Sequence, residues 1–571
     1  MGFVYFVIMI GVLVFVHELG HFLVAKAFDV KVIRFSIGFG PKLFGYTHGE
    51  TEYALCALPL GGYVLMLGGD FADAESIPEE DLPRTLLAKP IWQRSLVILA
   101  GPAFNILLPI LVFFFFGLTQ TTAPPSMVGE VMADTPAERA GLQPGDRITR
   151  LDGDEVKYWH EILEIVSDSP DRPLEMTWER DGKTFSATIT PESRTETQDA
   201  VGILQTTRGQ IGILLDTHGP TIAVTSPNTP AAQAGLKTFD RIIEINGTSV
   251  DRFDAISRIV RTSQGKTLDI TALRPENLPA TSGDLFTQKV IKLSVTPEQN
   301  AAGVHDIGLA RAELVLSEVE PGSAAAEAGL QPGDRITGLD GTPQRSWYIL
   351  RREIHQRINE KLVARDAGDT EPVTQTFTIE YERDGKLYTT TLTPRVSKYT
   401  DEYQQERYKR EIGWATLYDT VKPDAVDFPL GDRIVYSAKL GADKTWEGLS
   451  MIGRLFQRIF EGKVSFSKQV GGPILVGELA ARAGEAGIAS FLWTMALLSI
   501  NIGVFNLLPI PLLDGGRLML FAAEAIKRGP LSFRTRQITS YIGFVFIILL
   551  MVLAFKNDIE RNWDRIVDML F

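Results

Sequence analysis

The sequence contains a single cysteine and fewer basic than acidic residues, and both shortages exclude classes of protein. Cys56 has no second cysteine to pair with, so an intramolecular disulfide bond is impossible. Lysine and arginine number 57 against 70 aspartate and glutamate residues, which gives a formal net charge of −13. Nucleic-acid binding requires a concentrated basic face. We therefore expect no nucleic-acid partner.

Charged side chains are missing from four long stretches of the chain. A helix that crosses a bilayer needs about 20 predominantly apolar residues. We predict four transmembrane spans, at residues 3–28, 95–119, 488–512 and 537–555. The first span lacks the basic flank and the small-residue cleavage site of a signal peptide, so we expect it to be retained.

Lysine and arginine gather in two connections between these spans. One connection joins the first span to the second, and the other, residues 513–536, joins the third to the fourth. Short basic loops stay on the cytoplasmic side of a membrane. This predicts that the N-terminus, the long segment between the second and third spans and the C-terminus lie outside.

A repeat fills the long segment between the second and third spans. TPAERAGLQPGDRITRLDG begins at Thr135, TPAAQAGLKTFDRIIEING at Thr229 and SAAAEAGLQPGDRITGLDG at Ser323, each 94 residues after the last. Equal spacing indicates three copies of one module. Each copy predicts a short helix ended by glycine, a loop, a strand and an Asp-Gly or Asn-Gly turn.

These copies resemble the PDZ domain in its bacterial, protease-associated form. The shared core is A-G-L-x-x-x-D-R-I-x-x-x-[DN]-G. The resemblance implies α/β modules that bind extended peptides at a sheet edge, although any copy could instead be a spacer without a ligand. The second copy has Thr238-Phe239 where the others have Pro-Gly, so we expect its loop to differ.

Residues 435–463 carry an apolar helical face that includes Trp446 and Phe456. Most of the basic residues in this segment lie elsewhere on the helix. This pattern predicts an amphipathic helix at the outer membrane interface. A soluble helix packed on the modules is the alternative.

The first span contains the sequence H-E-L-G-H at residues 17–21. On a helix, His17 and His21 lie one turn apart on the same face. Two imidazoles at this spacing can bind one zinc ion, and Glu18 beside them can take a proton from water at the metal. Charged groups inside a span are costly and usually functional, which favours a metal site over a polar membrane edge.

Catalytic zinc usually has three protein ligands, so a third is needed. The remaining histidines lie in polar segments. Asp514 closes a long uncharged run, after Pro509 and Pro511 and before two glycines. Such a broken backbone can turn a side chain into a cavity within a membrane. We predict Asp514 as the third ligand; an ordinary loop aspartate at the membrane surface is the alternative.

Together, HExxH in the first span, LDG at 513–515 and PDZ-like modules in between resemble the site-2 protease family of intramembrane zinc metalloproteases. Other matching pieces are G-P-A-F-N at 101–105, P-L-G-G-Y-V at 59–64 and G-G-P-I at 471–474. The resemblance covers essentially the whole chain. The third module is a departure, because similar bacterial members typically have two.

The resemblance implies zinc-dependent hydrolysis of transmembrane segments of single-span membrane proteins, such as an anti-sigma factor or remnant signal peptides, in an envelope stress response. It makes His17, His21 and Asp514 the zinc ligands and Glu18 the catalytic residue. It also implies a bacterial inner-membrane protein, surrounded by the lipid bilayer, with its active site near the cytoplasmic face. The modules would be periplasmic, would bind peptides or partner proteins, and would filter substrates by size.

The family also suggests residues that contact the substrate. Asn501 and Asn506 match asparagines that engage an unwound substrate helix; hydrogen bonds between helices are the alternative. Residues 35–66 match a membrane-associated β-hairpin, whose edge could hold a substrate as an extended chain. Gly61, Gly62 and Tyr63 are the predicted contacts in this hairpin.

We therefore expect a multi-pass α-helical membrane protein with four spans, a membrane-associated β-hairpin and three extracytoplasmic α/β PDZ modules. The expected divisions are the first protease half (1–123), three modules (124–200, 201–298 and 299–398), a linker with the interfacial helix (399–485) and the second protease half (486–571). Two other functions stay open. One is a membrane-anchored PDZ scaffold with a non-catalytic metal site, and the other is a membrane zinc hydrolase that acts on a lipid or a soluble peptide.

Overall fold

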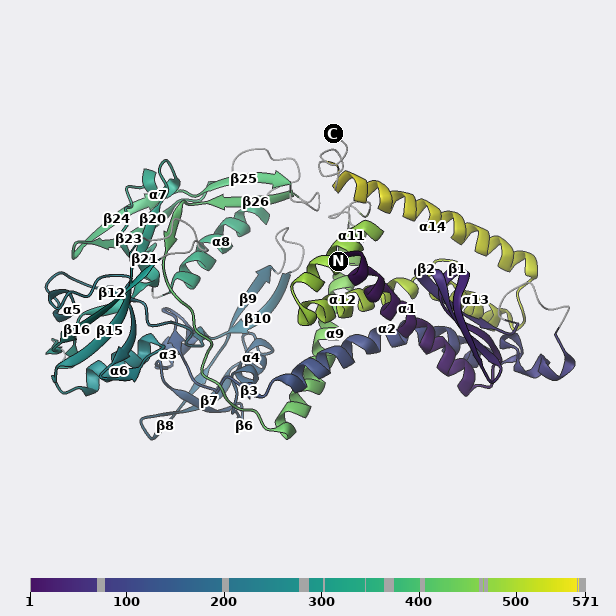
Figure 1. Cartoon of the computed structure of the whole chain (residues 1–571), viewed down its shortest axis with the longest axis horizontal. Helices are drawn as coiled ribbons and strands as arrows, with labels where there is room; N and C mark the ends of the chain where they lie inside the picture. The colour runs from purple at the N-terminus through teal and green to yellow at the C-terminus, as the bar shows by residue number, and fades with distance from the viewer. Residues whose placement is uncertain are drawn as a thin grey trace. The chain divides into compact units, whose positions relative to one another are not determined.

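The computed structural model describes residues 2–68, 77–197, 205–276, 287–300, 303–344, 346–363, 374–400, 406–461, 466, 471–561 and 563. The chain divides into two units: unit 1 comprises residues 1–121, 402–404 and 428–571, and unit 2 comprises residues 122–401 and 405–427. The two ends of the chain therefore share one unit. In Figure 1, the purple helix α1 (Gly2–Ala27) and the yellow helix α14 (Phe533–Arg561) both belong to unit 1.

Among the described residues, four helices are long and apolar enough to cross a bilayer: α1, α2 (Ile91–Thr119), α12 (Ile488–Asn506) and α14. Each coincides with a predicted span. Helix α12 ends six residues earlier than the predicted span, because the nearby Pro509 and Pro511 cannot continue a helix.

Helix α2 contains two prolines and is tied to α12 through one of them. Pro109 has no N–H to donate to the carbonyl of Asn105. The Ser499 hydroxyl of α12 donates to that carbonyl instead, at 2.7 Å. Helices α1 and α2 also approach closely, since a Cβ added at Gly20 would lie 2.3 Å from the Ala100 carbonyl oxygen.

The predicted β-hairpin consists of two long, irregularly paired strands, β1 (Val32–His48) and β2 (Thr51–Met66). Residues 34–37 pair with 52–55 on one side and with 62–65 on the other. Among the described residues, segment 62–65 is paired on that one side only, so it forms an edge of the sheet.

Unit 2 contains three four-stranded sheets of identical strand order, one for each predicted copy of the repeat. The strands in spatial order are β6 (Asp154–Glu155), β5 (Arg147–Leu151), β7 (Leu174–Arg180) and β8 (Lys183–Ile189); β14 (Thr248–Ser249), β13 (Arg241–Ile245), β15 (Leu268–Pro275) and β16 (Gln288–Val295); and β22 (Thr342–Pro343), β21 (Arg335–Leu339), β23 (Phe377–Arg383) and β24 (Lys386–Leu392). The long helices of the three repeats are α4 (Trp159–Ser167), α6 (Phe253–Thr262) and α8 (Trp347–Val363), and the short ones are α3 (Pro136–Arg139), α5 (Pro230–Gln233) and α7 (Ala324–Glu327). Each repeat has its own buried apolar core.

Each repeat also has a separate two-stranded sheet. The pairs are β4 (Glu130–Val131) with β11 (Ile213–Leu214), β12 (Ile222–Val224) with β19 (Leu309–Arg311), and β20 (Leu316–Val319) with β27 (Trp414–Thr416). The second strand of each pair follows an Ile-Gly sequence and lies beyond residues 200, 298 and 398, respectively. Strand pairing therefore extends each repeat beyond the C-terminal boundary predicted for its module.

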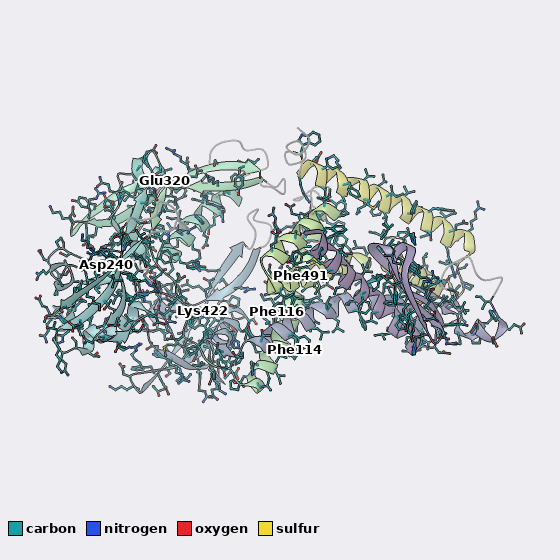
Figure 2. All side chains as sticks on the ribbon, in the orientation of Figure 1. Phe114, Phe116, Asp240, Glu320, Lys422 and Phe491 are labelled. Carbon is teal, nitrogen blue, oxygen red and sulfur yellow. The ribbon has the colours of Figure 1, made fainter. Side chains whose placement is uncertain are left out.

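The aspartate of the repeated motif forms an internal ion pair in every copy. Asp240, labelled in Figure 2, is fully buried, pairs with Arg274 at 2.7 Å and accepts the backbone N–H of Lys237 at 2.8 Å. The equivalent pairs are Asp146–Arg180 and Asp334–Arg383. The aspartate of the motif therefore stabilises the loop before the strand.

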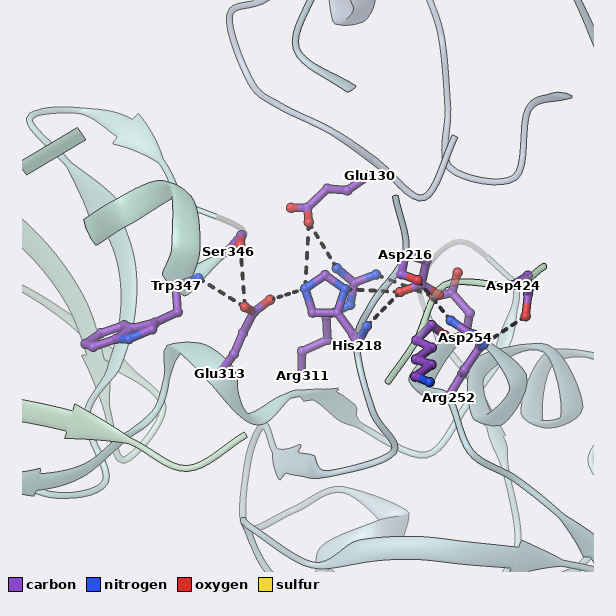
Figure 3. A network of polar contacts seen from close by, with 11 residues as sticks. Glu130, Asp216, His218, Arg252, Asp254, Arg311, Glu313, Ser346, Trp347 and Asp424 are labelled. Atoms are coloured by element: carbon purple, nitrogen blue, oxygen red, sulfur yellow. Dashed lines mark hydrogen bonds and ion pairs between the residues drawn. The ribbon is translucent and has the colours of Figure 1, made fainter. Parts of the chain in front are cut away.

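A histidine connects the three repeats inside unit 2 (Figure 3). His218 lies 2.9 Å from Glu313, 3.1 Å from Asp216 and 3.8 Å from Glu130, so both ring nitrogens face carboxylates. Glu130 belongs to β4 of the first repeat, and Glu313 lies on the short helix η3 (Ala312–Leu314) before the third. Glu313 also accepts the backbone N–H of Trp347, at the start of α8.

The predicted interfacial helix is α9 (Leu430–Phe460), and it packs on helices of unit 1. Its buried residues are Ser437, Gly441 and Thr445, which share one face. A Cβ at Gly441 would lie 2.6 Å from the Ile110 carbonyl oxygen of α2. Of the predicted apolar face, Trp446 is 70% exposed, whereas Phe456 packs against Phe505 of α12 with ring centroids 6.1 Å apart. The small residues allow this helix to approach α2 closely.

The remaining elements are short or flank the others. The other helices are α11 (Pro473–Glu485), α13 (Asp514–Lys527), η1 (Glu79–Arg84) and η2 (Leu86–Ala88). The remaining strand pairs are β3 (Thr122–Ala123) with β28 (Val426–Asp427), β9 (Glu192–Thr197) with β10 (Gln205–Gln210), β17 (Glu298–Gln299) with β18 (His305–Asp306), and β25 (Arg395–Thr400) with β26 (Glu406–Glu411).

Candidate active site

The three predicted metal ligands come together between α1 and α13, although almost the whole chain separates them in sequence. Asp514 Oδ2 lies 3.2 Å from His17 Nε2 and 3.5 Å from His21 Nε2. The ligand atoms all lie within 4.8 Å of one another, and no other such trio occurs in the described part of the chain. Two imidazole nitrogens and a carboxylate oxygen form a donor set that zinc prefers. The residues therefore fit a zinc ion.

The turn before α13 places Asp514 at the first position of this helix. After α12 ends at Asn506, the backbone folds back over the start of α13. A Cβ at Gly515 would lie 2.3 Å from the Leu507 carbonyl oxygen, and one at Gly516 would be equally close to the Ile510 carbonyl oxygen. Only glycine fits at these two positions, which explains why Asp514 is followed by both.

Helix α2 forms the wall behind the histidines. His21 Nδ1 lies 2.8 Å from the Val97 carbonyl oxygen, to which its N–H donates, and this leaves Nε2 free for a metal. A Cβ at Gly101 would lie 2.3 Å from His21 Nε2. From sequence, only the G-P-A-F-N segment at 101–105 pointed to this wall, and it indicated no role for its residues.

The edge segment of β2 lies beside the predicted catalytic residue. A Cβ at Gly62 would lie 3.1 Å from Glu18 Cγ and 2.8 Å from Val14 Cγ1, so this strand runs directly along α1. Gly61 has φ +128° and packs under the ring of Phe39. Tyr63 stacks on the same ring with centroids 6.0 Å apart, so its side chain is held within the sheet.

Asn501 and Asn506 are both partly exposed on α12. Within the described residues, neither side-chain amide forms a hydrogen bond to another helix. The substrate contacts of both asparagines therefore stay a prediction.

Comparison with known proteins identifies the family. Residues 5–550 match the sequence model of peptidase family M50. The chain belongs to this family. It is a membrane-embedded zinc metalloprotease that cleaves within the membrane.

Relatives align with nearly the whole chain. The regulator of sigma E protease of Salmonella typhi is 29% identical, and the regulator of sigma-E protease RseP of Escherichia coli is 27% identical; each alignment covers 97% of this chain and 98% of the relative. Among solved structures, the PDZ domain of the SdrC-like protein from Listeria innocua is 24% identical over 16% of this chain and 91% of that one, with a TM-score of 0.13.

Proposed function

We propose that this protease cleaves transmembrane segments of single-span membrane proteins, with His17, His21 and Asp514 as zinc ligands and Glu18 as the catalytic acid–base residue. One observation carries this proposal: the side-chain atoms of His17, His21 and Asp514 that could bind a metal lie within 4.8 Å of one another, and both histidines are on the helix that carries Glu18. The environment supports it, since α1 is long and apolar enough to span a membrane.

The mechanism follows from the side chains around this point. Bound zinc supplies a Lewis acid that makes water nucleophilic near neutral pH. Glu18, adjacent to His17, takes the proton from the attacking water and returns it to the leaving amine. The Val97 carbonyl keeps the proton of His21 on Nδ1, so that Nε2 keeps its lone pair for the metal.

The sheet edge supports a binding mode for the substrate. Hydrolysis requires an extended chain, and segment 62–65 offers unpaired backbone groups next to Glu18. We assign Gly61, Gly62 and Tyr63 to this edge contact. The amides of Asn501 and Asn506 would hold backbone groups that are released when the substrate helix opens.

We further propose an orientation and a pathway. The four apolar helices would span the bacterial inner membrane, with the active site near the cytoplasmic face and three periplasmic PDZ modules that bind peptides or partner proteins. Because two relatives are named as regulators of sigma E, an anti-sigma factor is one candidate substrate, and remnant signal peptides are another.

The test replaces Glu18 by Gln in the purified full-length chain in lipid vesicles. We expect zinc content to stay at the wild-type level and cleavage of a single-span reporter to fall by at least about 100-fold, the lower range of an acid–base contribution. The matched control is Glu80→Gln, at an exposed residue. Persistent cleavage in the Glu18 variant would contradict the mechanism. Cleavage by the wild type of a lipid or a soluble peptide, but not of the reporter, would favour the alternative hydrolase, and no cleavage at all would favour a scaffold.

A further inference from the structure

One face of α2 contacts both histidines of the site. Val97, Gly101 and Asn105 follow one another at four-residue spacing and therefore share that face. Val97 accepts the N–H of His21, and Gly101 leaves room for the rings. Asn105 makes the remaining contact, with its amide nitrogen Nδ2 3.1 Å from His17 Nδ1.

Asn105 is fully buried, and its side-chain oxygen has no hydrogen-bond partner. A buried polar atom without a partner is unfavourable, and such atoms in folded proteins call for an explanation. The backbone of this residue is held firmly, because the Ser499 hydroxyl donates to its carbonyl. The amide group can still turn over in place and present either its nitrogen or its oxygen to His17.

The two orientations of the amide correspond to two tautomers of His17. When the amide nitrogen faces Nδ1, that ring nitrogen accepts, and the ring proton sits on Nε2, which lies 3.2 Å from Asp514 Oδ2. A histidine that ligates through Nε2 carries its proton on Nδ1 and needs an acceptor there. Only the second orientation, with Oδ1 toward His17, supplies that acceptor.

We propose that Asn105 is a positioning residue that sets the tautomer of His17, and that its amide turns over as the metal binds. In the metal-free protein, Nδ2 donates to Nδ1, and His17 pairs with Asp514. In the metal-bound protein, Oδ1 accepts the Nδ1 proton, and Nε2 is free to ligate. This inference rests on the proposed function, because it requires His17 to be a ligand.

The two histidines would then differ in how they are held. His21 is fixed by a backbone carbonyl, which can only accept. His17 is held by a group that can both donate and accept, so the same contact persists with and without zinc.

The test measures zinc affinity by chelator competition, with the purified full-length chain in detergent. Asn105→Leu has nearly the same volume and no acceptor, and we expect a loss of affinity of about 10- to 100-fold, the usual result of removing such an outer partner. Asn105→Asp presents only acceptors, and we expect affinity at or above the wild-type value. Gly11→Ala on α1, whose added Cβ meets no atom within 4 Å, is the control, with unchanged affinity.

The possible outcomes separate this inference from the proposed function. Wild-type affinity in Asn105→Leu, or equal losses in the Leu and Asp variants, would overturn the role of Asn105. Wild-type affinity in His17→Ala would instead overturn the proposed ligand set. If Asn105→Leu does not fold, Asn105→Ser, whose shorter side chain cannot reach His17, replaces it. The zinc-induced rise in thermal stability, measured in every variant, is the second readout.

Discussion

At the residue scale, the site depends on positions without side chains as much as on the ligands. Gly20 lets the backbones of α1 and α2 approach each other, and Gly101 lets both imidazole rings lie against α2. Gly515 and Gly516 let the turn before α13 fold over the start of the helix that carries Asp514. A side chain at any of these four glycines would clash with the neighbouring backbone or with an imidazole ring. The arrangement of the proposed ligands therefore requires them.

The clearest residue-scale prediction concerns Gly101→Ala. The new methyl group would lie 2.3 Å from His21 Nε2, so the ring, which donates its N–H to the Val97 carbonyl, must shift from its position. We expect a loss of zinc affinity of about tenfold or more, with a parallel loss of cleavage. Zinc titration and a reporter assay would measure both. Gly11→Ala on α1 is the control, since no atom lies within 4 Å of its added Cβ, and equal losses in the two variants would contradict the explanation.

The residues proposed as ligands were identified from sequence, and the structure brings them together, whereas the residues that support them could not be identified in this way. Helical spacing alone places His17 and His21 on one face, and the uncharged context singles out Asp514. The roles of Gly101 and Asn105 depend on which face of α2 meets α1. That choice is made by packing between helices, which leaves no local pattern in the sequence.

At the scale of elements, periodicity predicted where helices and repeats occur better than it predicted what they contact. The four apolar helices occur where they were predicted, with α12 shortened by its prolines. The apolar face of α9 was predicted to lie at the outer membrane interface, and this stays a prediction. Its buried positions Ser437, Gly441 and Thr445 were not singled out from the sequence, because close approach between helices depends on side-chain size rather than on hydrophobicity.

The edge segment of β2 leads to an element-scale prediction. In Gly62→Ala, the new Cβ would lie 2.7 Å from the Ser36 carbonyl oxygen and 3.1 Å from Glu18 Cγ, so the strand must shift away from α1. We expect reporter cleavage to fall by about tenfold or more, the scale of a misplaced substrate, while zinc content stays unchanged. Gly45→Ala is the control, because its nearest neighbour is the flexible side chain of Lys42. A loss of zinc in the Gly62 variant would mean that the strand supports the metal site instead.

At the scale of the whole molecule, the repeats are linked by residues that lie outside the repeated motif. His218 lies between the first two copies, and its three carboxylate neighbours come from positions 130, 216 and 313. No sequence feature indicated a role for His218, because it lies in a polar segment without a motif. The structure makes it an ionic link among three repeats that each have their own core, beside further pairs such as Arg311–Glu130.

This link predicts a pH dependence of stability in unit 2. Burial opposes the charged form of His218 and Arg311 repels it, but the hydrogen bonds to Asp216 and Glu313 and the charge of Glu313 outweigh both and raise the pKa of His218 from 6.5 to about 9. The stabilisation is therefore complete below pH 6.5 and is lost as the pH rises toward 9. It amounts to roughly 3 kcal/mol. Thermal unfolding of the full-length chain between pH 6 and 10 should show this loss in the wild type and in the control His305→Gln, but not in His218→Gln. Parallel curves for all three proteins would mean that the link contributes nothing.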